Sequence, residues 1–120
     1  MRKMIAASLC LAALASPAFA QAPRNNPAYD EITEQGGDLA ECAGVVAAQG
    51  GLNPVTHPHN GVEGEWPALL SSILTRLHAE PGLQGMTGRY AASAARTYWA
   101  GRPRATRAAA ANRCRDRFGG

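Results

Sequence analysis

Two histidines that lie close together in a glycine- and proline-rich stretch give the sequence its first candidate chemistry. His57 and His59 flank Pro58 within residues 50–64. In an extended His-x-His segment both rings project from the same side of the chain, and neutral imidazole nitrogens bind zinc or copper. A protein zinc site uses three or four ligands. The sequence does not indicate a third ligand beside His57 and His59, because we expect His78 at a helix end facing water. Two interpretations therefore remain open for His57 and His59: they bind a metal ion in the loop, or they are loop side chains exposed to water.

Arginines near the C-terminus form the second candidate group. Guanidinium groups make bidentate contacts with phosphate and carboxylate, so a cluster of them suits an anionic partner. Two of the arginines, Arg89 and Arg96, precede the main cluster. The candidate residues for binding an anionic partner are Arg102, Arg104, Arg107, Arg113, Arg115 and Arg117.

The charge is divided unevenly along the chain, and this leaves two interpretations of the arginines open. Residues 21–80 contain two arginines and eight acidic residues, whereas residues 81–120 contain eight arginines and one aspartate. The basic half could bind another envelope protein or an anionic envelope component. It could equally pair with the acidic first helix inside the same molecule. Nucleic acid is not an expected partner, because no aromatic residues alternate with the C-terminal arginines.

Sequence motifs that indicate an enzyme are missing from the chain. It contains no Gly-x-Ser-x-Gly, no His-Glu-x-x-His and no glycine-rich phosphate loop. The acidic pairs Glu31/Glu34 and Glu63/Glu65 are of a kind that occurs on most solvated acidic surfaces. We therefore expect a non-enzymatic binding or interaction module that needs no cofactor, with a small enzyme lacking a known motif as the less favoured alternative.

Two neighbouring aromatic residues add a further possible contact with a partner. Tyr98 and Trp99 are adjacent, so on a helix their rings project in different directions. We expect at least one of them in the core. An exposed ring beside arginines would suit a protein interface, where aromatic residues and arginine are enriched.

The first 20 residues have the pattern of a cleaved secretory signal peptide. Arg2 and Lys3 precede the apolar run 4–15, and Ala18-Phe19-Ala20 resembles a signal peptidase site. The run is shorter than the roughly 20 residues that a membrane-spanning helix needs. No later apolar stretch is longer. We expect export, with a bacterial periplasm as the destination, a flexible leader at 21–27 and a single helical domain at 28–120.

The first expected helix follows Pro27 and ends at Gly50-Gly51. Apolar or small residues recur in steps of three and four, which is typical of one helix face. The pair Gly36-Gly37 weakens its middle, so a break with Asp38 as the cap of a shorter helix is an open alternative. The stripe consists of Tyr29, Ile32, Gly36, Leu39, Ala43 and Val46.

Three further helices are expected after the loop 50–64. The segment from Glu65 to Pro81 has the strongest apolar face and should be the core helix. A third helix at about 84–99 carries a weaker stripe of Leu83, Met86, Tyr90, Ala94 and Tyr98. A fourth, at about 103–118, has only a thin stripe of Ala110, Ala111, Cys114 and Phe118. The fold predicted is all-α, with three to four short helices in a small irregular bundle.

One disulfide is expected to hold this bundle together. Cys10 lies within the signal peptide, so only Cys42 and Cys114 remain to pair. Small exported domains with thin cores often carry disulfides. The bridge would attach the fourth helix, whose alanine-rich face buries little apolar surface, to the first.

Overall fold

The structure, a computed structural model, describes residues 32–119, which form a single compact unit of four helices without strands. The all-α prediction is confirmed. The expected signal peptide at 1–20, the leader at 21–27 and residues 28–31 lie outside the described residues. The prediction of one helix running on from Pro27 is wrong, because Ile32 and Thr33 are not helical and the first described helix begins at Glu34. The helices are α3 (Glu34–Gly50), α4 (Glu65–Leu77), α5 (Gly85–Ala100) and α6 (Arg104–Phe118).

Helix α3 is continuous through Gly36-Gly37, so the alternative break at Asp38 is wrong. The Thr33 hydroxyl caps the helix by accepting a hydrogen bond of 2.9 Å from the Gly36 amide. Packing favours glycine at position 36, because a Cβ there would lie 3.0 Å from Cδ1 of Leu83. The helix ends at Gly51, whose φ of 68° is left-handed and whose amide donates to the Ala47 carbonyl.

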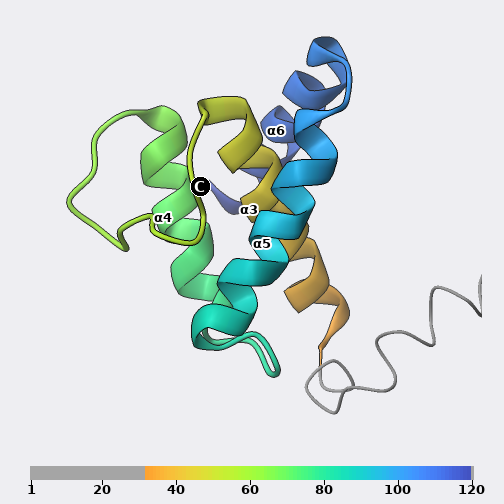
Figure 1. Ribbon diagram of the computed structural model, residues 1–120. Coiled ribbons are helices and arrows are strands. Elements are labelled where there is room, and N and C mark those ends of the chain that lie inside the picture. The colour runs from red at the N-terminus through yellow and green to blue at the C-terminus, as the bar shows by residue number, and fades with distance from the viewer. Residues whose placement is uncertain (1–31, 120) are drawn as a thin grey trace, which may run out of the picture. The chain divides into compact units, whose positions relative to one another are not determined.

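The core forms where α3 meets the other three helices (Figure 1). Its largest fully buried side chains come mainly from α3 and α4 and include Leu39, Val45, Val46, Leu70, Ile73, Leu74 and Leu77. Each leucine or isoleucine buried in this way contributes roughly 1.5–3 kcal/mol. The strong apolar face predicted for the helix starting near Glu65 is confirmed, but the expectation that this helix is the central one is wrong, because the other three helices pack mainly against α3.

The face of the third helix that the sequence predicted to be buried is exposed instead. Leu83, just before α5, is buried, but the other four members of the stripe, Met86, Tyr90, Ala94 and Tyr98, are exposed. The buried residues of α5 are instead Gly88, Arg89 and Ala92.

Small residues explain why α5 turns this other face inward. A Cβ at Gly44 of α3 would collide with the Cβ of Ala95 and would lie 2.6 Å from the backbone nitrogen of Arg96. Gly88 is equally confined, because its added Cβ would meet the Leu83 carbonyl. The backbones of α3 and α5 therefore approach closely across a glycine–alanine contact that leaves no room for aromatic rings.

The predicted disulfide is present and joins α3 to α6. Cys42 and Cys114 are bonded, with their Cα atoms 5.6 Å apart. The thin stripe predicted for the last helix is also confirmed, because Ala110, Ala111 and Phe118 are buried beside Cys114. The bridge therefore fastens α6, whose buried face consists largely of alanines, to the central helix of the fold.

Candidate functional site

An open groove of about 300 Å³ runs beside the disulfide, between α3, α5 and α6. Its apolar part is formed by the disulfide itself together with Val45 and Ala110. Its remaining side chains are an indole and four charged groups: Trp99, Asp38, Glu41, Arg113 and Arg117. The groove thus combines apolar surface with charges of both signs.

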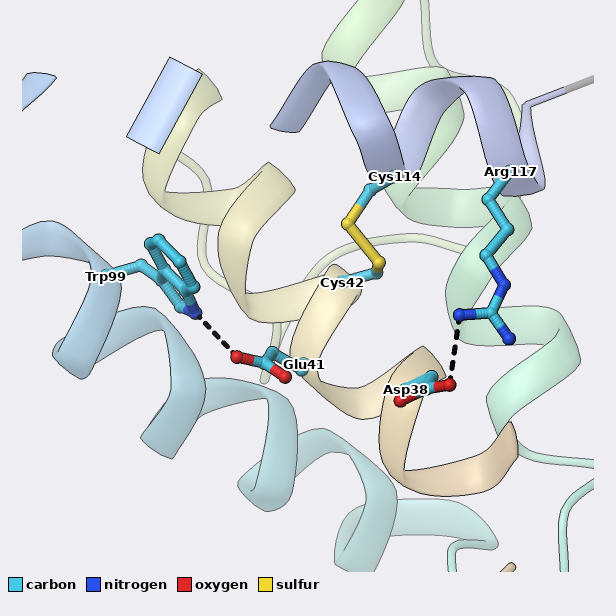
Figure 2. Close-up of a disulfide and its surroundings, with 6 residues drawn as sticks. All are labelled: Asp38, Glu41, Cys42, Trp99, Cys114 and Arg117. Atoms are coloured by element: carbon cyan, nitrogen blue, oxygen red, sulfur yellow. Dashed lines mark hydrogen bonds and ion pairs between the residues drawn. A yellow bond between two sulfur atoms is a disulfide. The ribbon is translucent and has the colours of Figure 1, made fainter. Parts of the chain in front are cut away.

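Both carboxylates of the groove are already engaged (Figure 2). Trp99 donates from Nε1 to Oε2 of Glu41 across 3.2 Å, and Arg117 donates from Nη1 to Oδ2 of Asp38 across 2.9 Å. Asp38 and Glu41 lie one turn apart on α3 and so share a face. The Arg117–Asp38 ion pair is exposed to water, and pairs of this kind contribute only about 0–1 kcal/mol. These contacts orient the walls of the groove more than they stabilise the fold.

Arg113 is the arginine that the groove leaves without an internal acceptor. Within the described part of the chain its guanidinium makes no hydrogen bond and no ion pair, although it lines the groove one turn before Arg117. It is exposed to water. The groove therefore presents, beside an indole ring, a guanidinium that has no ion-pair partner in the described part of the chain.

The other candidate arginines have partners of different kinds. Arg115 donates to Oε2 of Glu65 across 2.7 Å, and this hydrogen bond raises the pKa of Arg115 above its ordinary value. Arg107 donates to the side chain of Gln49 and to two carbonyls at the corner between α5 and α6. The guanidinium of Arg102 stacks over the Tyr98 ring, 5.5 Å from its centre. Arg104 is exposed and its side chain makes no hydrogen bond or ion pair within residues 32–119.

The six arginines do not form one basic face. Arg117 reaches α3 on one side of α6, and Arg115 reaches α4 on the other. Internal pairing of the acidic first helix with the basic last helix, which the sequence left open, is therefore realised in the Asp38–Arg117 pair.

A second hollow, of about 280 Å³, lies between α4 and the end of α6. Its lining includes Glu65, Leu69, Ser72 and Arg115. The two charged groups among these are bonded to each other. This hollow therefore offers no unpaired charge to a ligand, in contrast to the groove.

The two candidate metal ligands have separate structural partners. Nε2 of His57 donates to the Pro67 carbonyl across 2.9 Å, and Nε2 of His59 accepts from Nη2 of Arg89 across 3.0 Å. Between residues 32 and 119 no group of three or more His, Cys, Asp and Glu side chains is placed to hold a metal ion. The geometry gives the predicted loop metal site no support.

The prediction that His78 faces water is only partly right. Its ring is half-buried, its centre lies 4.9 Å from that of His59, and its buried Nε2 finds no hydrogen-bond partner among residues 32–119. Burial lowers the pKa of His78 from its ordinary 6.5, and the nearby Arg89 and His59 lower it further.

Two arginines that sequence reasoning grouped with the basic cluster hold the loop 51–64 instead. Arg89 is buried and donates from Nη1 to the carbonyls of Pro54, Val55 and His57, at 3.0, 3.2 and 2.8 Å. Arg96 donates from Nε to the Leu52 carbonyl across 2.6 Å. The signal that could have revealed this role is their position on the same face as Gly88 and Ala92, the small residues that α5 buries.

Comparisons with protein-family models, curated proteins and solved structures found no match to this chain. In the described range, no helix combines the length and the apolar character needed to cross a membrane.

Proposed function

We propose that this protein is an exported, non-enzymatic binding module that holds an acidic segment of another envelope protein in the groove beside the Cys42–Cys114 bridge. The signal-peptide pattern of residues 1–20 supports export. A bacterial periplasm is the compartment proposed, since it allows the disulfide to persist.

The observation that carries the proposal is the unused charge of Arg113. Asp38 is ion-paired with Arg117, and Glu41 accepts a hydrogen bond from the uncharged indole of Trp99, so Arg113 is the guanidinium of the groove whose donors have no acceptor within residues 32–119 and stay open to a ligand. A guanidinium binds a carboxylate through two parallel hydrogen bonds, which are stronger than bonds between neutral groups. Arg113 therefore suits an aspartate or glutamate side chain of the partner.

The remainder of the groove suits the rest of such a segment. Trp99 is half-buried, and together with Val45 it offers apolar surface to the methylene groups of an acidic side chain or to a neighbouring residue. Protein interfaces are enriched in tryptophan and arginine for this reason. An open groove of about 300 Å³ accommodates a few side chains of an extended segment.

The groups in the groove favour binding over catalysis. Acid–base catalysis needs a carboxyl or imidazole positioned to move a proton. Asp38 and Glu41 are instead fixed in an ion pair and a hydrogen bond. The proposal is accordingly a binding module.

Fluorescence of Trp99 tests the proposal directly. The variant Trp66→Phe retains Trp99 as its one tryptophan, because the chain contains two. We expect a hexaglutamate peptide to change this fluorescence in a saturable way and a hexalysine peptide to leave it unchanged. The affinity should fall as salt is raised from 50 to 500 mM, because screening weakens exposed charge pairs.

Two arginine variants in the Trp66→Phe background provide the matched comparison. Arg113→Ala should weaken hexaglutamate binding about tenfold, in line with the loss of roughly 1.4 kcal/mol from a charge-assisted contact. Arg104→Ala removes another exposed arginine of α6, outside the groove, and should leave the affinity unchanged. Equal weakening in both variants would mean that binding follows net charge and not the groove, and the proposal would be wrong.

Export is tested separately. When the full chain is expressed in a bacterium with a periplasm, the periplasmic fraction should contain a product whose first residue is Gln21. An uncleaved product in the cytoplasmic fraction would contradict the export part of the proposal while leaving the groove untouched.

A further inference from the structure

The outward face of α5 carries no charge. The charged residues of this helix, Arg89 and Arg96, both turn inward to the loop 51–64. Outward lie large side chains with much of their surface in water: Met86 is 44% exposed, Tyr90 60% and Tyr98 57%. This is the same face that the sequence predicted to be buried. Within the described residues no other helix covers it, although the Arg102 guanidinium lies over the Tyr98 ring.

The composition of this face resembles that of an interface. Tyrosine and methionine are enriched at protein interfaces, whereas aspartate, glutamate and lysine are depleted. Met86, Tyr90, Ala94 and Tyr98 follow one another at intervals of four residues, so they form one continuous stripe along α5. Their three large side chains expose about 300 Å² together, within the range in which an apolar patch is often functional.

The order of residues along the stripe is symmetric. Ala94 stands in the middle, with Tyr90 four residues before it and Tyr98 four residues after it. When two identical helices pair in antiparallel orientation about Ala94, Tyr90 of each copy lies opposite Tyr98 of the other. The small alanine side chain lets the two helices approach at the symmetry axis, where a larger residue would separate them.

We infer that this stripe is a homodimer interface, in which α5 packs against α5 of a second copy of the chain in antiparallel orientation, with Ala94 at the two-fold axis. A two-fold interface brings identical surfaces together, so any charge on them would face a like charge. The α5 residues on this face avoid this repulsion because none of them is charged, and the Arg102 guanidinium over Tyr98 lies at the end of the stripe, away from the axis at Ala94. Aromatic pairs such as the two Tyr90–Tyr98 contacts add about 0.5–1.5 kcal/mol each beyond the area that they bury.

The dimer should be weak and concentration-dependent. The large side chains of the two stripes would together bury about 600 Å², and smaller neighbours such as Thr87 and Thr97 would add to this area. The total stays below the roughly 1,200–2,000 Å² of a stable interface and fits a transient one. Trp99 packs edge-on against Tyr98 and donates to Glu41 of α3, so the groove borders the end of the stripe. The inference does not depend on what the groove binds.

Sedimentation velocity across concentrations tests the inference. The mature wild-type chain should sediment as a monomer at about 10 μM, with a sedimentation coefficient that rises toward the dimer value at about 1 mM. Tyr90→Glu places two negative charges in the interface and should abolish the rise. Asn112→Glu adds the same charge at an exposed position of α6 and should sediment like the wild type.

A cysteine at the axis tests the register. In Ala94→Cys the two introduced thiols would face each other, so mild oxidation should convert most of the protein to a covalent dimer. Thr106→Cys, exposed on α6, should crosslink slowly. The inference is overturned by a wild-type chain that stays monomeric at 1 mM, by a Tyr90→Glu variant that dimerises as the wild type does, or by equal crosslinking of the two cysteine variants. If the stripe instead binds a lipid or an unrelated protein, the wild-type chain will stay monomeric at 1 mM.

Discussion

The guanidinium of Arg89 lies 3.0 Å from Nε2 of His59, and this contact fixes the proton of the imidazole ring. Arginine has only donors, so Nε2 must accept, and the proton of the neutral ring is on Nδ1. Nδ1 lies 3.5 Å from Oγ1 of Thr75, whose hydroxyl donates to the Ser71 carbonyl across 3.0 Å. A buried arginine, a loop histidine and α4 are thereby linked, and together they hold the loop 51–64 in place.

Removing the Arg89 side chain should destabilise the protein more than removing any exposed arginine. Arg89→Met keeps the length of the side chain but leaves three loop carbonyls and His59 without their donor. We expect a loss of about 2–4 kcal/mol in the free energy of unfolding, measured in urea. Arg104→Met should change it by less than about 0.5 kcal/mol. Equal stabilities of the two variants would show that the loop does not depend on Arg89.

The stability of the fold should fall in mild acid through His78. Burial, together with Arg89 and His59, lowers the pKa of His78 below 6.5, so the folded chain takes up this proton less readily than the unfolded chain. The contribution of neutral His78 to the free energy of unfolding is therefore fully present above pH 6.5 and is lost as the pH falls through the pKa of His78 in the folded chain. Urea unfolding should show a smaller decrease between pH 7.5 and 5 for His78→Gln than for the wild type. The same decrease in both proteins would assign the effect to other groups.

The disulfide should matter most for the last helix. The cysteines are separated by 72 residues. Closing a loop of that length lowers the entropy of the unfolded chain, which raises the free energy of unfolding by about 4 kcal/mol. In the double variant Cys42→Ala, Cys114→Ala we expect that loss, together with faster amide exchange in residues 104–118 than in α4. An α6 that stays as protected as α4 would show that Phe118 and the alanines hold the helix without the bridge.

Two glycines of α3 should respond to alanine in opposite directions. A Cβ at Gly44 would collide with α5, so Gly44→Ala should cost about 1–3 kcal/mol. Gly37 has no neighbouring atom within 4 Å of an added Cβ, and Gly37→Ala should stabilise the helix by about 0.5–1 kcal/mol. Thermal unfolding of both variants measures the difference. A Gly44→Ala variant as stable as Gly37→Ala would mean that α3 and α5 do not approach closely.

Much of the helical arrangement could be predicted from local signals. The glycine and proline residues that border the segment from Glu65 place that helix correctly, and its leucines and Ile73 mark the core. The pairing of Cys42 with Cys114 follows from counting cysteines if Cys10 belongs to the expected signal peptide. Each of these inferences needs only the properties of neighbouring residues along the chain.

The orientation of α5 could not be predicted in the same way. A stripe of Met86, Tyr90 and Tyr98 favours burial if each side chain is judged by its own apolar surface. The structure instead buries Gly88 and Ala92, because close packing against Gly44 depends on a residue more than 40 positions away. The same reversal turns Arg89 inward, so its role in holding the loop was hidden from sequence reasoning.

Only some of the residues that line the groove could be predicted from the sequence. The sequence singled out Arg113, Arg117 and the two cysteines, and Trp99 was considered as a possible contact for a partner. It did not indicate that Asp38 would pair with Arg117 or that Glu41 would accept from Trp99, since these contacts require α3, α5 and α6 to be placed together. The distinction between paired and unpaired arginines therefore comes from the tertiary structure alone.

Nuclear magnetic resonance of the labelled mature chain tests the central claim, that the groove beside the disulfide receives an acidic segment, most directly. In a titration with hexaglutamate, the largest shifts of ¹H–¹⁵N signals should be those of the Trp99 indole N–H and the Arg113 side-chain Nε–H. Signals of Trp66 and Arg104 should stay in place. Shifts centred away from the groove, or none up to millimolar peptide, would contradict the claim.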